Sequence, residues 1–169
     1  MQKKITTFLT YDGQAEEAVN LYTSVFPNSK ILSERRYGEA GPGEKGSLMT
    51  ASFELDGQEF MALNGGPSFT FGQGISLFVD CETQEEVDQL WEKLSEGGAQ
   101  LQCGWLTDRF GVSWQIVPSV LGELLGDEDP EKANRVMSAM LQMNKIEIDG
   151  LRRAYESEES AASAGTRSG

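Results

Sequence analysis

The feature that most limits how this chain can fold is one order of strand and helix signals that occurs twice. Four positions in one predicted helix match four in another at a constant offset of 69 residues: Glu16, Glu17, Leu21 and Tyr22 correspond to Glu85, Glu86, Leu90 and Trp91. Residues 57–61 can likewise be laid on residues 111–115, with an aromatic side chain at the fourth position of each. The chain is therefore predicted to contain two copies of one structural unit.

The first copy is predicted to be a strand, a helix and three strands. Residues 5–11 indicate a strand, and apolar residues then recur at helical spacing from Ala15 until Pro27. Strand patterns follow at 30–37, 48–55 and 59–63, and Asp56-Gly57 between the last two is typical of a tight hairpin turn. This order is βαβββ.

The second copy begins after the break at Gly65-Gly66-Pro67. Ile75, Leu77 and Val79 mark a strand, and residues 83–86 form a capping box at a helix start. That helix is predicted to end at Gly97-Gly98, and strands are predicted at 101–106 and 112–117 with a turn at Phe110-Gly111.

The C-terminal part departs from this order. Asp129 and Pro130 predict the start of a helix whose apolar face is formed by Val136, Met137, Met140 and Leu141, and which covers the sheet or a partner subunit. The predicted organisation is one domain over residues 1–145, with modules at about 1–67 and 74–120 plus this helix. Residues 146–169 are predicted to form a short helix and a flexible tail.

Charge and residue types exclude several classes of partner and chemistry. The net charge of -13 argues against nucleic acid and acidic membranes, and neither a membrane-spanning run nor a signal peptide is recognisable, which predicts a cytoplasmic protein. The only cysteines, Cys81 and Cys103, lie in different predicted strands and are read as two reduced thiols. The chain has no histidine, so the commonest general base and a common metal ligand are missing.

A motif at residues 103–118, Cys-Gly-Trp-Leu-Thr-Asp-Arg-Phe-Gly-Val-Ser-Trp-Gln-Ile-Val-Pro, resembles the signature strand pair of PhnB-like proteins. Similar segments at 15–18, 37–39, 60–67 and 81–87 extend the resemblance over roughly residues 5–145. PhnB-like proteins, also described as 3-demethylubiquinone-9 3-methyltransferase-like, form a branch of the vicinal-oxygen-chelate, or glyoxalase/bleomycin resistance, superfamily. The resemblance implies an α+β fold in which paired βαβββ modules make a cupped mixed sheet, here with an added C-terminal helix. It also implies a homodimer with a pocket on the concave face.

Superfamily enzymes hold a divalent metal with His and Glu side chains, and this chain departs from that pattern. Gln115 stands where glutamate is common, and Met61 occupies the corresponding place in the first module. We therefore predict no cofactor. An all-carboxylate metal site using Glu54 or Asp108 stays open beside the simpler interpretation of solvated or hydrogen-bonded carboxylates.

The methyltransferase description can be weighed by chemistry. A nucleotide-type cofactor normally needs a glycine turn between a strand and a helix. The glycines at 38, 41, 43 and 46 lie between two predicted strands instead, which predicts a mobile loop beside the pocket mouth.

The pocket residues are predicted from aromatic, amide, thiol and carboxylate side chains. The aromatic candidates would line a cavity or pack in the core, the amides would orient a ligand or cap backbone groups, and Cys103 is a nucleophile candidate or a strand thiol. Eight residues form this candidate set, none with an assigned catalytic role: Phe8, Glu54, Asn64, Cys103, Trp105, Asp108, Trp114 and Gln115.

Three functions remain open after these arguments. The first is a metal-free small-molecule binding homodimer, which needs only a cup with an aromatic lining. The second is a metal-dependent enzyme, a lyase, dioxygenase or isomerase, and the third is a protein-interaction module with a vestigial cavity.

Overall fold

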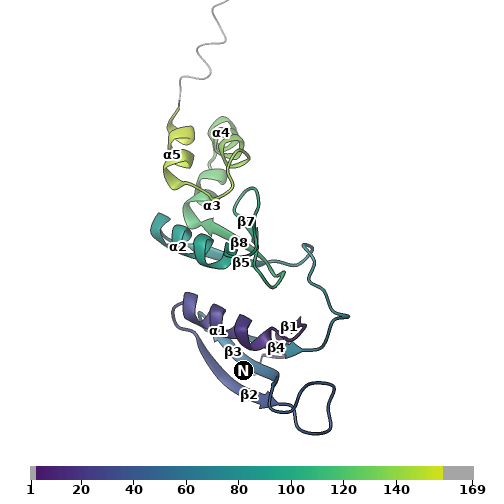
Figure 1. The fold of residues 1–169 in the computed structure, drawn as a ribbon. Coiled ribbons are helices and arrows are strands. Elements are labelled where there is room, and N and C mark those ends of the chain that lie inside the picture. Colours follow the sequence, from purple (N-terminus) through teal and green to yellow (C-terminus); the bar gives the residue numbers. More distant parts are fainter. Residues whose placement is uncertain (1–2, 158–169) are drawn as a thin grey trace, which may run out of the picture. The chain divides into compact units, whose positions relative to one another are not determined.

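The computed structural model describes residues 3–157, which fall into two compact units divided after Gly72 (Figure 1). Each unit contains one four-stranded mixed sheet with helices, so the chain is of the predicted α+β class. Within the described residues, no helix has the length and apolar character needed to cross a membrane. Most of the tail predicted at the C-terminus, from residue 158 onward, lies outside the described residues.

The first unit has the predicted order of one strand, one helix and three strands. Its elements are β1 (Thr7–Tyr11), α1 (Ala15–Val25), β2 (Lys30–Arg36), β3 (Leu48–Leu55) and β4 (Gln58–Asn64). The sheet order is β1-β4-β3-β2, with β1 parallel to β4 and the other pairs antiparallel. Asp56 and Gly57 in the β3–β4 hairpin both have positive φ angles, 48° and 77°, as tight hairpin turns require.

One face of this sheet packs against α1, because strand side chains alternate between the two faces. Phe53 stacks on Phe60 with ring centroids 5.6 Å apart, and Tyr22 of α1 lies 6.5 Å from Phe53. The hydroxyl of Tyr11 donates to that of Tyr22 at 3.2 Å. The opposite face of the sheet carries Phe8 and Met61, which are less buried.

The second unit repeats this order and sheet topology. Its elements are β5 (Leu77–Cys81), α2 (Gln84–Ser95), β6 (Ala99–Gln100), β7 (Trp105–Thr107) and β8 (Ser113–Pro118), and the sheet order is β5-β8-β7-β6. The predicted cap is present, since Thr83 Oγ1 accepts from the N–H of Glu86 at 3.2 Å. Phe8 lies opposite Met61 in the first sheet, as Phe78 lies opposite Gln115 in the second. This pairing matches the predicted alignment of residues 57–61 with 111–115.

The predicted strand at 101–106 is correct only at its end, where Trp105 and Leu106 begin β7. β6 ends at Gln100 and β7 starts at Trp105, with a turn between them in which Cys103 and Gly104 have φ angles of 60° and 82°. These left-handed angles cannot occur in a strand. The turn is closed by a bond from Trp105 N to the carbonyl of Gln102 at 3.1 Å.

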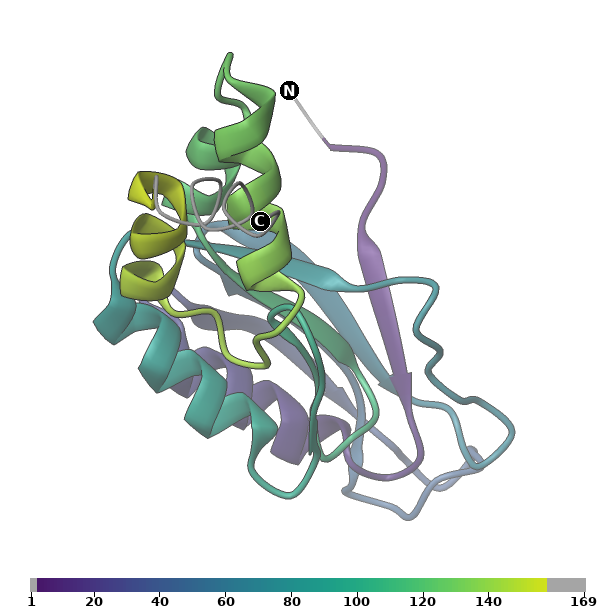
Figure 2. The ribbon, with the colours of Figure 1, turned by 90° about the horizontal axis from the view of Figure 1, so that it is seen from above.

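The C-terminal part has one helix more than predicted. It contains α3 (Ser119–Leu125), α4 (Pro130–Met140) and α5 (Ile148–Glu156), and α3 is the helix that the sequence analysis missed. Asp129 caps α4 as predicted, because Oδ1 accepts from Glu131 N at 3.0 Å. We call residues 119–156 the appendage; its helices α4 and α5 lie side by side (Figure 2).

The appendage has its own apolar core, formed with the end of β8 by Val117, Leu121, Val136, Ile146 and Leu151. The predicted apolar face of α4 needs correction here. Val136 is fully buried and Met140 packs against the core, but Met137 and Leu141 are 39% and 51% exposed. The helix is rotated so that only part of its apolar stripe is covered.

Candidate functional site

The second sheet has one covered face and one face that lines a cavity. Leu106, Trp114 and Ile116 point toward the α2 side and are buried. The register places Trp105 and Phe78 on either side of Gln115 on the opposite face. Strand alternation adds Asp80 and Val117 to this face.

A cavity of about 670 Å³ lies on this second face. The strand side supplies Phe78, Asp80, Cys103, Trp105, Gln115 and Val117. Leu121, Gly122, Glu123 and Leu125 of α3 and Met140 of α4 form the opposing wall. The cavity is open to solvent, and its volume and its combination of apolar walls with a few polar groups lie within the range of small-molecule sites.

Polar side chains of the cavity have fixed orientations. Gln115 Nε2 donates to Ser76 Oγ at 2.9 Å. Asp80 Oδ1 accepts from Ser119 Oγ at 2.8 Å, and the same hydroxyl lies 3.2 Å from the carbonyl oxygen of Cys81. These bonds hold one amide and one carboxylate at the edge of an otherwise apolar surface.

A second hollow, of about 680 Å³, lies along α2 and is a weaker candidate. Its lining includes Asp88, Glu92 and Lys145, and Lys145 is already paired with Asp88 at 2.9 Å. That hydrogen bond helps to lower the pKa of Asp88, after the larger effect of the bond from Gln84. Asp88 and Lys145 therefore neutralise each other, while Glu92 and Glu96 leave the lining with a net negative charge.

The two cysteines differ in accessibility, and both are free thiols. Cys81 is fully buried, and desolvation is the main cause that raises the pKa of its thiol to about 12. Cys103 lines the cavity at the β6–β7 turn, where its Sγ lies 3.7 Å from the carbonyl oxygen of Met140.

Asp108 and Trp114 lie in the core of the second unit and outside the cavity lining. Asp108 is only 2% exposed, and its Oδ1 accepts from the N–H groups of Phe110 and Val112 at 2.9 and 3.0 Å. Its Oδ2 accepts from Trp114 Nε1 at 2.9 Å. The carboxylate therefore shapes the β7–β8 turn and satisfies a buried indole.

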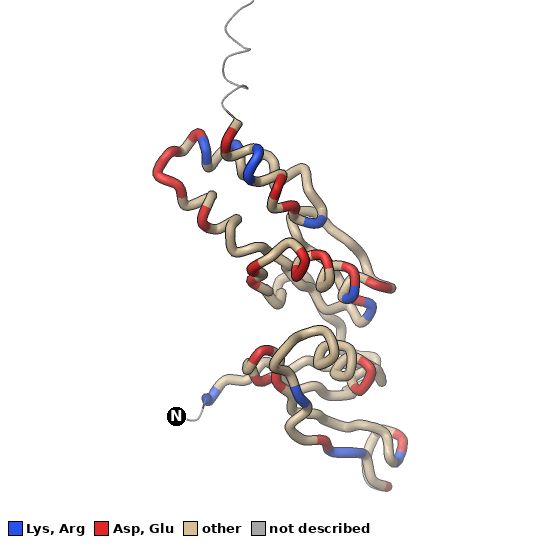
Figure 3. Tube along the Cα trace, turned by 90° about the vertical axis from the view of Figure 1, so that its left-hand side faces the viewer, with Lys and Arg blue, Asp and Glu red and all other residues tan. Residues whose placement is uncertain are grey.

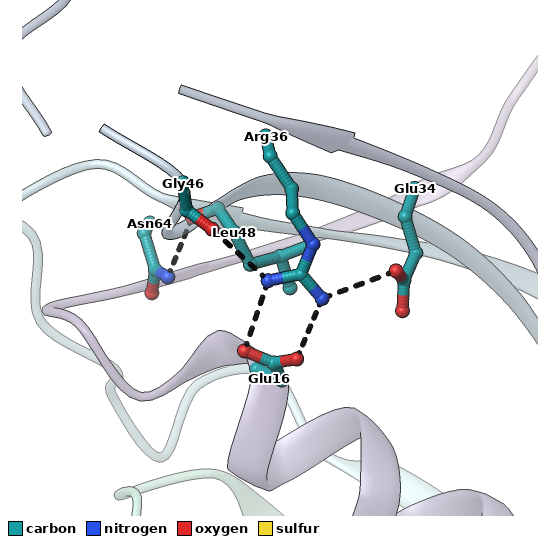
Figure 4. Close-up of polar contacts among 6 residues, drawn as sticks. All are labelled: Glu16, Glu34, Arg36, Gly46, Leu48 and Asn64. Atoms are coloured by element: carbon teal, nitrogen blue, oxygen red, sulfur yellow. Dashed lines mark hydrogen bonds and ion pairs between the residues drawn. The ribbon is translucent and has the colours of Figure 1, made fainter. Parts of the chain in front are cut away.

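Phe8, Glu54 and Asn64 belong to the first unit. Phe8 is 49% exposed on β1, and Glu54 on β3 lies opposite Glu59 on β4. Asn64 Oδ1 accepts from Ala15 N at 2.9 Å. Asn64 Nδ2 donates to the carbonyl of Leu48, also at 2.9 Å (Figure 4). Its amide thus ties the start of α1 to β3.

The glycine-containing loop at 38–46 joins β2 to β3, as predicted, and is bonded to its own sheet. Arg36 donates to Glu16 at 2.7 Å and to the carbonyl of Gly46 at 3.3 Å (Figure 4). The hydrogen bond from Arg36 lowers the pKa of Glu16. Tyr37 donates its hydroxyl to the carbonyl of Asn64 at 2.7 Å, which anchors the start of the loop.

The residues around Gln115 do not fit a divalent metal centre. Such ions need several carboxylate, imidazole or thiolate ligands converging on one point. Within residues 3–157, no three His, Cys, Asp or Glu side chains are grouped in this way. Asp80 is the one carboxylate on the strand side of the cavity, and Gln115 offers only a neutral amide.

Of the eight pocket residues predicted from the sequence, three line the cavity: Cys103, Trp105 and Gln115. Sequence reasoning missed Phe78 and Asp80, which alternate with the strand residues Leu77 and Val79 and so lie on the other face. It also missed the α3 wall, although Leu121, Leu124 and Leu125 have helical spacing after Pro118.

Comparison with known proteins places these features in a family context. The family model described as 3-demethylubiquinone-9 3-methyltransferase matches residues 3–117. A putative 3-demethylubiquinone-9 3-methyltransferase, PhnB protein, from Bacillus cereus is 47% identical, covers 69% of this chain and 99% of its own, and has a TM-score of 0.65. Protein PA1353 from Pseudomonas aeruginosa is 21% identical over 69% of this chain and 98% of its own, with a TM-score of 0.58. No curated protein matches the sequence.

Removing the Asp108 carboxylate is predicted to destabilise the second unit. Asp108→Ala leaves two buried backbone donors and the Trp114 indole unbonded, and should lower the free energy of unfolding by about 3 kcal/mol. Urea titration followed by circular dichroism measures this. Asp12→Ala, at an exposed position, is the control and should change little. An Asp108→Ala protein as stable as the wild type would contradict the structural role.

The cysteines are predicted to react at very different rates with iodoacetamide. Cys103 should be alkylated first in the native protein at pH 8, because Cys81 is buried and its thiol remains protonated. Peptide mass spectrometry after timed quenching identifies the modified residue, and unfolding in urea should remove the difference. Faster labelling of Cys81 would show that the strand end opens more readily than its burial implies.

Proposed function

This chain belongs to the family described as 3-demethylubiquinone-9 3-methyltransferase, the PhnB-like proteins, and from that premise we propose that it binds a small, largely apolar molecule without a metal ion. The observation that carries this proposal is the cavity of about 670 Å³ between the second sheet and α3. The free thiols of Cys81 and Cys103 suit a reducing cytoplasm, where we place this activity.

The chemistry of the lining supports binding more than catalysis. Phe78, Trp105 and Met140 offer apolar contact area, while Gln115 offers an amide held by Ser76. Methyl transfer is not part of the proposal, because the glycine-containing loop joins β2 to β3 rather than a strand to a helix.

The fluorescence of Trp105 can be used to detect binding in the cavity directly. Of the three tryptophans, Trp91 and Trp114 are 5% and 2% exposed, whereas Trp105 is half-buried and lines the cavity. We predict that the neutral probe 4-phenylbutanol changes tryptophan emission in a saturable way, and that Trp105→Phe removes this change. The melting temperature should rise with the probe concentration.

Gly122 lines the cavity and has room for a side chain. A Cβ added at this helical position meets nothing within 4 Å. Gly122→Leu should therefore fold normally and abolish the probe response, whereas the matched Gly122→Ala should keep most of it. A response that survives Gly122→Leu would place the binding site elsewhere.

The same melting assay separates the metal-dependent alternative. After chelator treatment, Mn²⁺, Fe²⁺, Ni²⁺, Zn²⁺ and Mg²⁺ are each expected to leave the melting temperature unchanged. A selective rise with one ion would support a metal-dependent enzyme instead. If neither ions nor organic probes change the melting temperature, and the protein specifically captures one other protein, the interaction module would be favoured.

We also propose that the protein is a homodimer, as the family resemblance implies. Support comes from large apolar side chains that are exposed on or beside the first strand of each unit and lie outside the cavity lining: Ile5, Phe8 and Ile75. Light scattering coupled to size exclusion should give twice the chain mass, and Phe8→Lys should shift the protein toward the monomer. A wild-type monomer across the accessible concentration range would refute this assembly.

A further inference from the structure

We propose, building on the binding function above, that the ligand carries a cationic group on an apolar body and that the appendage helps to select it. The first ground is the charge of the cavity. Its described lining contains two carboxylates, Asp80 on β5 and Glu123 on α3, and no Lys or Arg. A carboxylate ligand would meet only like charge there, while an ammonium group would meet opposite charge from two sides.

The second ground is the position of Asp80. Ser119 Oγ donates to its Oδ1 at 2.8 Å, which orients the carboxylate at the junction of β8 and α3. Asp80 is exposed, and within residues 3–157 no protein donor bonds its Oδ2, so this oxygen is open to water or to a donor on a ligand. An ammonium group has donors and no acceptor, and so matches this site.

The third ground is the aromatic surface next to the carboxylates. Phe78 and Trp105 flank Gln115 on the same face of the sheet, and both line the cavity. Aromatic faces attract cations through their quadrupole and also cover apolar groups. Aromatic walls with carboxylates at the edge therefore favour an alkyl or aryl amine over a neutral or acidic molecule of the same size.

The fourth ground is the origin of the wall. The matched family region ends at residue 117, and Leu121, Glu123, Leu125 and Met140 all come after it. Glu123, one of the two carboxylates, is thus contributed by the appendage. Figure 3 shows further acidic residues where α3 connects to α4, which add negative potential near this wall. The proposed preference for a cation therefore depends on the C-terminal helices, which lie outside the family match, as well as on the second sheet, which lies within it.

Three probes with one apolar body test the inference on the full chain. Calorimetric titration of 4-phenylbutylamine, 4-phenylbutanol and 4-phenylbutyrate should show the amine binding about fivefold more tightly than the alcohol, and the acid binding most weakly. The advantage of the amine should shrink at high salt, because screening weakens exposed charge pairs.

Neutral variants assign the preference to residues. Asp80→Asn keeps an acceptor for Ser119, and Glu123→Gln keeps its size; each should reduce amine affinity while leaving alcohol affinity unchanged. Glu128→Gln, which lies between α3 and α4 outside the lining, is the matched control and should change neither. Equal binding of amine and alcohol, or an amine preference that survives both variants, would overturn the inference. Failure of the alcohol itself to bind would instead overturn the proposed binding function.

Discussion

The second unit depends on the backbone of Gly104, which is bonded in two directions. Its N–H donates to the carbonyl of Asn144, and its carbonyl accepts from Ile116 N, both at 2.8 Å. One residue thus joins the appendage to β8. Its φ of 82° suits glycine, and a Cβ there would lie 2.7 Å from the carbonyl oxygen of Ile116. The wall of the cavity is held in place through this contact, together with the bond from Cys103 N to the carbonyl of Met143.

The two sheets share one topology but carry different chemistry at equivalent positions. In the first sheet, Met61 lies between Phe8 on β1 and Ser52 on β3. In the second sheet, Gln115 lies between Phe78 on β5 and Trp105 on β7. The first sheet therefore offers a thioether and a hydroxyl where the second offers an amide and an indole. The two units thus share one framework, and single side chains distinguish their faces.

The fold was largely predictable because apolar periods of 2 and 3.6 residues encode strands and helices directly. β3 was predicted to the residue, whereas the strand predicted at 101–106 matched only the start of β7. The chain turns at Cys103, a non-glycine residue whose positive φ cannot be recognised from the sequence. The site was less predictable, since alternation does not reveal which face stays open. Asp108 and Trp114 looked like pocket residues, yet register places the indole on the α2 side with the carboxylate bonded to it. To predict the α3 wall, the sequence analysis would have had to recognise a short helix that begins directly after β8 ends at Pro118.

The cavity wall comes late in the chain, which has a consequence for its synthesis. The paired βαβββ modules are complete at Pro118, but Met140 and the segment at Met143 and Asn144 that holds the β6–β7 turn emerge from the ribosome afterwards. Until those residues have been synthesised, the Met140 part of the cavity wall and the carbonyls that bond the β6–β7 turn are missing. Nonsense mutations far downstream of the last strand would therefore remove part of the cavity lining and the partners that hold the turn carrying Cys103.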